Sequence, residues 1–179
     1  RMIYSTGNTH LLSAILTQAT GMSTLEFARQ YLGKPLSIQI HPWMRDPQGI
    51  YFGGNEMHLT PRAMLEIGKL YLNHGLSGRT RVVSKSWIQN SLKPRTYSPR
   101  NGYGYGFGWW NQPMITHQVY FAWGYGGQFI FIVPDLRLVV VVTSSPRPGR
   151  GRREHRQAIL DLLERDILPA IAQPSTNQD

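Results

Sequence analysis

Residues 119–142 read VYFAWGYGGQFIFIVPDLRLVVVV, and this stretch decides the fold class. It contains three runs rich in β-branched and aromatic residues, at 119–123, 128–133 and 138–143, which are typical of β-strands. A glycine-rich turn separates the first two runs, and a Pro-Asp-Leu-Arg turn separates the last two. Because such short turns join antiparallel neighbours, the stretch predicts an antiparallel meander. The valine run has no polar face, which predicts cover on both of its faces.

The sequence on either side of this stretch completes the predicted sheet layer. Residues 103–110 alternate glycine with aromatic residues, which predicts a strand whose glycines let another backbone come close. Residues 154–171 carry apolar residues at helical spacing, so this last helix can cover part of the sheet.

The first half of the chain predicts helices joined by Gly/Pro turns. Asn8 can cap a helix that ends at Gly21, with an apolar stripe made of Leu11, Leu12, Ile15, Leu16 and Ala19. Ser23 and Glu26 form a capping box for a second helix, which is expected to bury Leu25, Ala28 and Leu32.

A third helix is predicted from Thr60, which is followed by proline, through about Asn73. We therefore expect an α+β fold in which helices flank an antiparallel β-sheet. A helical and loop subdomain is expected at about 1–100, the sheet strands with the last helix at about 101–172, and a polar tail at 173–179.

Composition excludes several classes of protein. The 179 residues include no cysteine, which excludes a disulfide scaffold, a cysteine nucleophile and a thiolate metal site. The longest apolar run, at 138–142, is far too short to span a membrane as a helix.

The formal net charge is +9, and almost half of it is concentrated in one segment. Ten residues supply +4, through Arg147, Arg150, Arg152, Arg153 and Arg156 less Glu154. Such a cluster can hold phosphates of RNA, DNA or lipid head groups. A solvated loop that leads into a helix is the simpler interpretation, because no aromatic residue lies between Arg147 and Arg156 to stack on bases.

Two short segments carry residues suited to catalysis. Residues 4–8, Tyr-Ser-Thr-Gly-Asn, place Tyr4 on a turn before a helix N-terminus, where a phenol can relay protons; packing of the ring is the alternative. Residues 123–128, Trp-Gly-Tyr-Gly-Gly-Gln, begin the apolar hairpin, and glycines there let backbone N–H groups approach a substrate carbonyl oxygen. A β-bulge or a tight turn explains the same glycines. The six histidines are scattered singly, and no Gly-x-Ser-x-Gly or His-Glu-x-x-His motif occurs.

The order of these segments resembles one family. After the tyrosine turn come Asp-Pro-Gln-Gly at 46–49, a glycine pair at 53–54, Leu-Thr-Pro-Arg at 59–62 and then the glycine-rich strand. This order is similar to that of the serine β-lactamase and penicillin-binding-protein superfamily, in its class C-like branch with esterases and 6-aminohexanoate-dimer hydrolases. The resemblance covers about residues 2–170 and implies a β-lactamase/transpeptidase-like fold.

The resemblance also implies roles for individual residues. In that family a serine from a Ser-x-x-Lys helix attacks an amide or ester carbonyl, the lysine and a tyrosine share the proton transfers, and a Lys/His-x-Gly strand closes the site. Tyr4 would then be the general base and proton shuttle, the backbone N–H of Gly127 an oxyanion donor, and Thr6 a substrate contact in place of the usual asparagine. Further substrate-binding positions would be Trp123, Gly124, Tyr125 and Gly126. Three indoles either line an apolar pocket or pack in the core: Trp109, Trp110 and Trp123.

No Ser-x-x-Lys sequence occurs in this chain, since the residues three places before its four lysines are Tyr31, Glu66, Val82 and Asn90. In family members that element precedes the tyrosine turn, and this chain opens on Arg1. We therefore expect the C-terminal part of a serine hydrolase that acts on an ester or amide through an acyl-enzyme, inactive alone because the Ser-x-x-Lys nucleophile segment is absent; its partner would be the missing N-terminal part of the same domain. Because Gly124 offers no side-chain cation, an esterase or amidase is favoured over a β-lactamase.

The remaining expectations concern partners and compartment. The substrate is expected to be a small or peptide-like ester or amide, with no cofactor and no metal. The resemblance favours a periplasmic or secreted protein. Two alternatives stay open: a non-catalytic binding or regulatory relative with the same fold, and, least favoured, a nucleic-acid-binding protein that uses the arginine loop.

Overall fold

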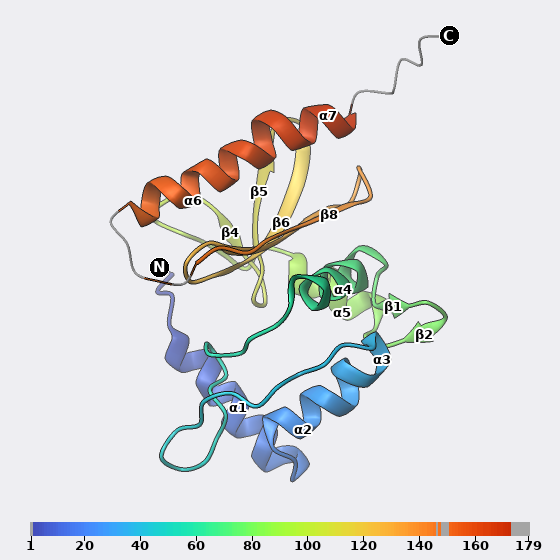
Figure 1. Cartoon of the computed structure of the whole chain (residues 1–179), viewed down its shortest axis with the longest axis vertical. Coiled ribbons are helices and arrows are strands. Elements are labelled where there is room, and N and C mark those ends of the chain that lie inside the picture. The colour runs from blue at the N-terminus through green and yellow to red at the C-terminus, as the bar shows by residue number, and fades with distance from the viewer. Residues whose placement is uncertain (1, 146, 148–150, 173–179) are drawn as a thin grey trace.

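A six-stranded antiparallel sheet forms the centre of the computed structural model, which describes residues 2–145, 147 and 151–172 (Figure 1). Each strand pairs with its neighbours in sequence, so the predicted antiparallel meander is confirmed. The strands are β3 (Thr96–Tyr97), β4 (Gly104–Tyr105), β5 (Trp110–Met114), β6 (His117–Gly124), β7 (Gln128–Val133) and β8 (Leu138–Val142). A separate hairpin consists of β1 (Leu76–Ser77) and β2 (Thr80–Arg81).

Helices lie on both sides of the sheet, as the α+β prediction requires (Figure 1). The helices before the sheet are α1 (Thr6–Thr20), α2 (Thr24–Ala28), the π-helical turn η1 (Arg29–Gly33), α3 (Lys34–Leu36), α4 (Pro61–Leu72) and α5 (Lys85–Leu92). The continuous helix after it comprises α6 (Arg152–Asp161), the π-helical turn η2 (Leu162–Ile167) and α7 (Leu168–Ala172).

Two predicted helix starts are confirmed by side-chain caps, whereas the predicted Asn8 cap is wrong, because α1 begins at Thr6 after Ser5 and Asn8 lies within the helix. The Ser23 hydroxyl accepts a hydrogen bond from the Glu26 N–H, and the Glu26 carboxylate accepts one from the Ser23 N–H. The Thr60 hydroxyl accepts a hydrogen bond from the Ala63 N–H at the start of α4. Gly21 ends α1 with a φ of 69°, in the left-handed region that favours glycine.

The two faces of the sheet carry separate cores. The larger core lies beneath the C-terminal helix and includes Phe121, Phe129, Phe131, Ile159, Leu163 and Leu168. The smaller core lies against α4 and includes Trp109, Ile130 and Ile132. In β8, Val140 and Val142 pack on the larger core, whereas Val139 and Val141 pack on the smaller one. The cover predicted for both faces of the valine strand is therefore present, although this edge strand stays half-buried.

The predicted continuous strand at 103–110 is wrong, because the structure divides these residues between β4, a turn and the first residue of β5. β4 spans only two residues, and Gly106 then donates a backbone hydrogen bond to the Trp109 carbonyl (2.8 Å) in a tight turn. A Cβ on Gly106 would collide with the Ser91 carbonyl of α5. The glycine therefore permits the close backbone approach that the alternating pattern predicted, at the turn that leads from β4 into β5.

Helix α1 presents an unexpected face to the rest of the chain. Its buried residue is Ser13, whose hydroxyl donates to the Tyr51 carbonyl (2.6 Å) and lies 2.5 Å from the Thr24 hydroxyl oxygen. The apolar stripe points away from these contacts, and three of its members are 60–63% exposed: Leu11, Leu12 and Ile15. The helix is predicted correctly, but its apolar stripe does not face a core within the described residues.

Among residues 2–145, 147 and 151–172, no helix has the length and apolar character needed to cross a membrane. The predicted tail at 173–179 and Arg150 of the arginine loop lie outside the described residues.

Candidate active site

Tyr4 lies in the segment that leads into α1, and its ring rests on two aromatic residues of the sheet. The ring stacks on Trp110, with centroids 5.8 Å apart, and meets Tyr105 edge-on at 5.9 Å. Tyr105 and Trp110 are cross-strand partners in β4 and β5, and their ring centroids are 4.6 Å apart. Tyr4 itself is 58% exposed, so its phenol is held by ring contacts yet open to a ligand.

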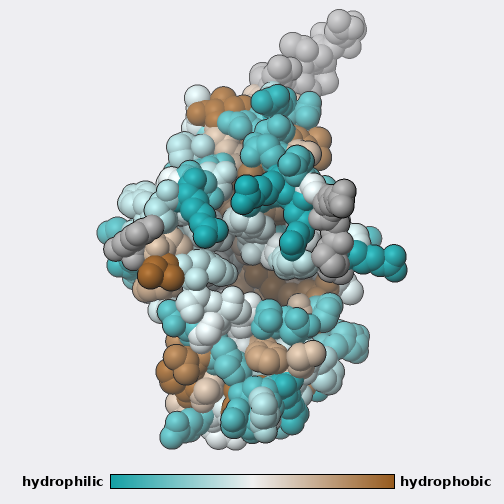
Figure 2. Space-filling view, turned by 90° about the vertical axis from the view of Figure 1, so that its left-hand side faces the viewer, coloured by the Kyte–Doolittle hydropathy of each residue, from teal (hydrophilic) through white to brown (hydrophobic). Residues whose placement is uncertain are grey.

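The aromatic surface continues from Trp110 to the glycine turn. The ring centroids of Trp110 and Trp123 are 6.1 Å apart, and Trp123 stacks on Phe129. The structure thus places Tyr4 and Trp123, which are far apart in sequence, on one face of the sheet. Figure 2 shows this side of the molecule, where hydrophilic side chains lie above a recess with a hydrophobic floor.

Trp109 does not belong to this surface. It is buried on the opposite face beneath α4, with its ring 4.4 Å from that of Tyr71. Because neighbouring residues of an extended chain point to opposite faces, Trp109 and Trp110 cannot line one pocket. For Trp109, core packing is the correct alternative.

The glycines predicted as a site strand lie mostly in a turn. Gly124 ends β6, and residues 125–127 connect it to β7. Gly127 has a φ of 92°, and a Cβ there would lie 3.0 Å from both His155 Nε2 and Ile159 Cδ1 of α6. Any side chain at this position would therefore be strained and crowded. The tight turn that was the alternative explanation of these glycines is therefore present. The role of the Gly127 N–H as an oxyanion donor stays a prediction.

Two arginines of α6 lie on the aromatic residues of this turn. Arg152 Nη1 donates a hydrogen bond to the Tyr125 hydroxyl (2.5 Å), and its guanidinium lies 5.2 Å from the Tyr125 ring centroid. The Arg156 guanidinium lies 4.7 Å from the Trp123 ring centroid. Positive charge is therefore present beside the turn, although Gly124 carries none. The sequence indicated only a solvated arginine loop, because the docking of α6 on this hairpin is a long-range contact.

A glycine pair fixes α1, the helix that begins at Thr6. A Cβ on Gly53 would collide with the Thr9 carbonyl and lie 2.9 Å from Ser13 Cβ. A Cβ on Gly54 would lie 2.5 Å from Thr6 Cγ2. Backbone contact therefore sets the position of the first two turns of α1, and with it the path of the chain at Tyr4 and Thr6. The Thr6 side chain is exposed and free to meet a ligand.

A histidine–aspartate pair reinforces the same contact. His10 Nε2 lies 2.9 Å from Asp46 Oδ2, and Asp46 Oδ1 accepts hydrogen bonds from the backbone N–H groups of Gln48 and Ile50. Partial burial alone would raise the pKa of Asp46, but the hydrogen bonds from Ile50, His10 and Gln48 together lower it. The sequence marked the 46–49 turn, and the pairing with His10 depends on the folded structure.

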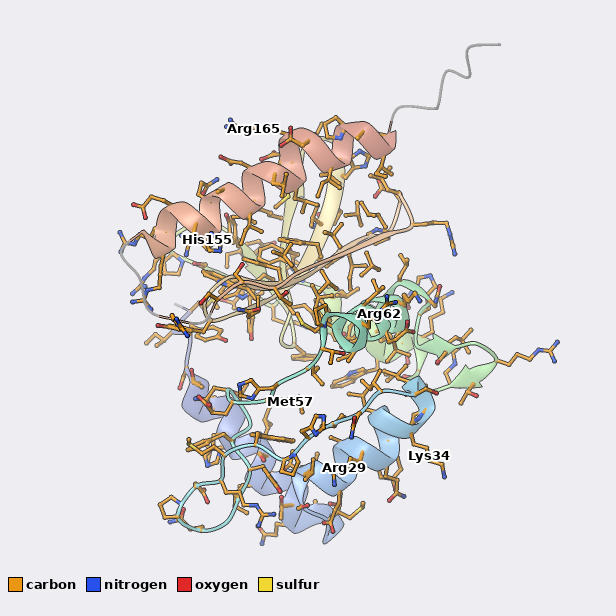
Figure 3. The ribbon with its side chains drawn as sticks, viewed as in Figure 1. Arg29, Lys34, Met57, Arg62, His155 and Arg165 are labelled. Carbon is orange, nitrogen blue, oxygen red and sulfur yellow. The ribbon has the colours of Figure 1, made fainter. Side chains whose placement is uncertain are left out.

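The other labelled histidine and cations lie on different layers of the fold. Figure 3 places His155 on α6 and Arg62 on α4, on opposite sides of the sheet, with Arg29 and Lys34 in the lower helical layer. A shallow pocket at η1 holds none of the predicted site residues and is lined by Arg29, Gly33, Lys34, Ser37, Ile38, Gln39 and Ile40. In the part of the chain that the structure describes, no three His, Asp or Glu side chains are grouped as metal ligands.

Sequence comparisons identify similar proteins. The sequence model of the beta-lactamase family matches residues 1–164. A 6-aminohexanoate-dimer hydrolase of Paenarthrobacter ureafaciens is 28% identical over 90 residues, which make up 50% of this chain and 23% of that protein.

Solved structures share the fold. A Bacillus anthracis protein provisionally identified as a 6-aminohexanoate-dimer hydrolase superposes with a TM-score of 0.74 at 20% identity, over 96% of this chain and 45% of that one. A beta-lactamase from Mycobacterium bovis gives a TM-score of 0.72 at 17% identity, over 97% of this chain and 65% of that one. The chain therefore spans less than half of the Bacillus anthracis structure and about a quarter of the curated relative.

Proposed function

This chain belongs to the beta-lactamase family, and we propose that the whole protein is a serine hydrolase that cleaves an ester or amide through an acyl-enzyme. One arrangement supports this: Tyr4 rests on Trp110, and Trp110 contacts Trp123 beside the glycine turn. Acyl transfer needs a proton-transferring group and N–H donors on the same side of the substrate. On this surface Tyr4 would be the proton-transferring group, and the glycine turn would supply the N–H donors.

In the proposed reaction the nucleophile is the serine of a Ser-x-x-Lys segment, which this sequence does not contain. Tyr4, together with the lysine, accepts the serine proton as Oγ attacks the carbonyl carbon. The Gly127 N–H stabilises the negative charge that develops on the carbonyl oxygen. The C–O or C–N bond then breaks, Tyr4 returns the proton to the leaving alcohol or amine, and water hydrolyses the acyl-enzyme. The chain without the serine is therefore inactive.

The same surface suggests which substrates fit. Thr6 and residues 123–126 would contact the substrate on either side of the reacting bond. The guanidinium groups of Arg152 and Arg156 favour a small or peptide-like ester or amide that carries a negative group near the glycine turn. The Arg152→Gln variant of the whole protein is expected to raise KM for an acidic ester more than for a neutral ester of the same size.

The decisive experiment joins the upstream Ser-x-x-Lys segment to this chain and measures hydrolysis of p-nitrophenyl esters. The Tyr4→Phe variant is expected to lower kcat/KM by about 10²–10⁴-fold, the usual contribution of general acid–base catalysis. Tyr97→Phe is the matched control, because Tyr97 is also an exposed tyrosine (64%) but lies on β3. Absence of turnover, or a Tyr4→Phe variant as active as the wild type, overturns the proposal. A full-length gene without Ser-x-x-Lys would favour the non-catalytic relative.

A further inference from the structure

His10 lies on α1, six residues after Tyr4, and both nitrogens of its ring have a partner in the loop that precedes α4. Nε2 lies 2.9 Å from Asp46 Oδ2, and Nδ1 accepts a hydrogen bond from the Gly53 N–H, with 3.4 Å between the two nitrogens. The ring also contacts that of Phe52, with centroids 5.1 Å apart. One side chain of α1 therefore binds the loop at two separate points.

These two hydrogen bonds determine the tautomer of His10. A backbone N–H can only donate, so Nδ1 accepts from Gly53 with its lone pair and the ring proton lies on Nε2. This proton faces the Asp46 carboxylate, whose other oxygen accepts hydrogen bonds from the N–H groups of Gln48 and Ile50. The geometry therefore requires a neutral imidazole in its Nε2–H form, with a fixed acceptor on one side and a fixed donor on the other.

The loop that is held in this way lies directly on the first turns of α1. A Cβ on Gly53 would collide with the Thr9 carbonyl, and one on Gly54 would lie 2.5 Å from Thr6 Cγ2. Thr6 is the first residue of α1 and follows Tyr4 by two positions. The contact between loop and helix therefore determines the path of the chain where it leaves Tyr4.

We propose that His10 is a positioning residue for Tyr4: its Nδ1 holds Gly53 against α1 and thereby fixes the start of this helix. This inference rests on the proposed role of Tyr4 as general base. Such a base must stay within hydrogen-bond reach of the proton that it accepts. Tyr4 is 58% exposed and meets the sheet through ring contacts, so the path of the chain before α1 decides whether its ring stays on Trp110.

The first test determines the tautomer of His10 in the wild-type whole protein, without any enzyme activity. NMR of isotope-labelled histidine at a pH of about 8, where a free imidazole is neutral, distinguishes protonated from unprotonated ring nitrogens. The contact with Phe52 assigns the His10 signals, which should show a proton on Nε2 and none on Nδ1. His117 is the internal control with the opposite expectation, because its Nδ1 lies 2.5 Å from Asp135 Oδ2. A proton on Nδ1 of His10 overturns the proposal.

The second test separates the two hydrogen bonds by the activity of the whole protein that carries the Ser-x-x-Lys segment. In His10→Asn the amide oxygen replaces Nδ1 and can still accept from Gly53, whereas in His10→Gln the amide nitrogen replaces Nε2 and can still donate to Asp46. We expect kcat/KM for a p-nitrophenyl ester to fall on the order of tenfold in His10→Gln and less in His10→Asn. A merely structural role of the bond to Asp46 predicts the reverse order, since glutamine is also the better helix former. Equal losses, or the reverse order, overturn the proposal.

The ring of Tyr4 gives a third measurement, which does not depend on turnover. Stacking on Trp110 shifts the NMR signals of the Tyr4 ring, and this shift should decrease in His10→Gln and persist in His10→Asn. His41→Gln is the matched control, because it makes the same substitution at an exposed histidine of the loop before α4 and should leave the Tyr4 signals unchanged. Unchanged Tyr4 signals in His10→Gln overturn the proposal. An inactive wild type in which the His10 variants shift Tyr4 as expected overturns the proposed function alone.

Discussion

The N-terminal third of the chain and the remainder are stabilised in different ways. Residues 61–145 with 151–172, which we call the sheet unit, bury aromatic and aliphatic side chains on both faces of the sheet. Residues 2–60, which we call the α1 unit, centre on a cluster of only three buried residues, Leu25, Ile40 and Tyr51. Polar bonds connect its segments instead, such as Ser13 to the Tyr51 carbonyl and Arg29 to the Ile40 carbonyl (2.8 Å). The sheet unit thus has its own core, whereas the α1 unit depends on hydrogen bonds and leaves its apolar stripe exposed.

The largest expected effect tests this contrast directly. Phe131→Ala removes a fully buried ring from the main core and should lower the free energy of unfolding by about 3–5 kcal/mol. Leu12→Ala removes a side chain that is 63% exposed and should change it by less than about 0.5 kcal/mol. Urea denaturation measures both. Similar losses for the two variants would show that the α1 unit buries more than the structure indicates.

The second prediction concerns the buried serines of the two units. Ser13→Ala leaves the Tyr51 carbonyl without its donor and removes a long-range tie, so it should cost about 1–3 kcal/mol. Ser91 is equally buried, but its hydroxyl donates to the Ile88 carbonyl of its own helix, so Ser91→Ala should cost less than about 1 kcal/mol. Thermal unfolding of both variants gives the comparison, and the reverse order would contradict it.

The helix caps provide a third, smaller comparison. Thr60 caps α4 in the sheet unit with a side-chain hydrogen bond, so Thr60→Ala should cost about 1 kcal/mol. Ser5 occupies the same position before α1, but its side chain makes no cap hydrogen bond, so Ser5→Ala should have an effect below about 0.5 kcal/mol. Chemical denaturation again measures both. An equal cost for Ser5→Ala would mean that this hydroxyl caps α1 in solution.

The smallest expected effects concern stability in acid. Each unit contains a histidine–aspartate pair, His10 with Asp46 in the α1 unit and His117 with Asp135 in the sheet unit. Hydrogen bonds lower the folded-state pKa of Asp46 and of Asp135 below the ordinary value of 3.8. Each carboxylate therefore stabilises the fold fully above its unfolded-state pKa, and this contribution is lost as the pH falls through the lowered folded-state pKa.

The partners of the two carboxylates differ, which gives the measurement. The hydrogen bond from His117 is the largest cause for Asp135, so His117→Gln should remove most of the pH dependence that Asp135 contributes. Asp46 keeps its backbone hydrogen bonds from Ile50 and Gln48, so the His10→Gln variant should retain much of the pH dependence of stability that Asp46 contributes. Melting temperatures between about pH 5 and 2 test this difference. An equal loss of the pH dependence of the melting temperature in both variants would contradict this prediction.

The sequence predicted the sheet unit better than the α1 unit, and the reason is physical. Strand period, turn residues and helix caps act over a few neighbouring positions, so the meander and the start of α4 were predictable, as was the local capping box of α2 in the α1 unit. The buried face of α1 depends on the distant loop at Tyr51, which no local period encodes. The pairing of Tyr4 with Tyr105 and of Arg152 with Tyr125 likewise joins segments that meet only in the folded chain. The roles of the candidate site residues therefore stay predictions, and their neighbours in the folded chain could not be inferred from local sequence.

The glycine pair at 53–54 has a consequence for how this sequence can vary over evolution. Gly53 and Gly54 touch the first turns of α1 without room for a Cβ. The path of the chain at Tyr4 is therefore set by backbone contact and not by a packed side chain. Drift at the exposed positions of α1 should therefore leave the phenol in place, whereas any replacement of the pair should shift it. Substitution rates are thus expected to be opposite to the usual rule, with the exposed positions of α1 changing freely and the glycine pair in the loop nearly invariant.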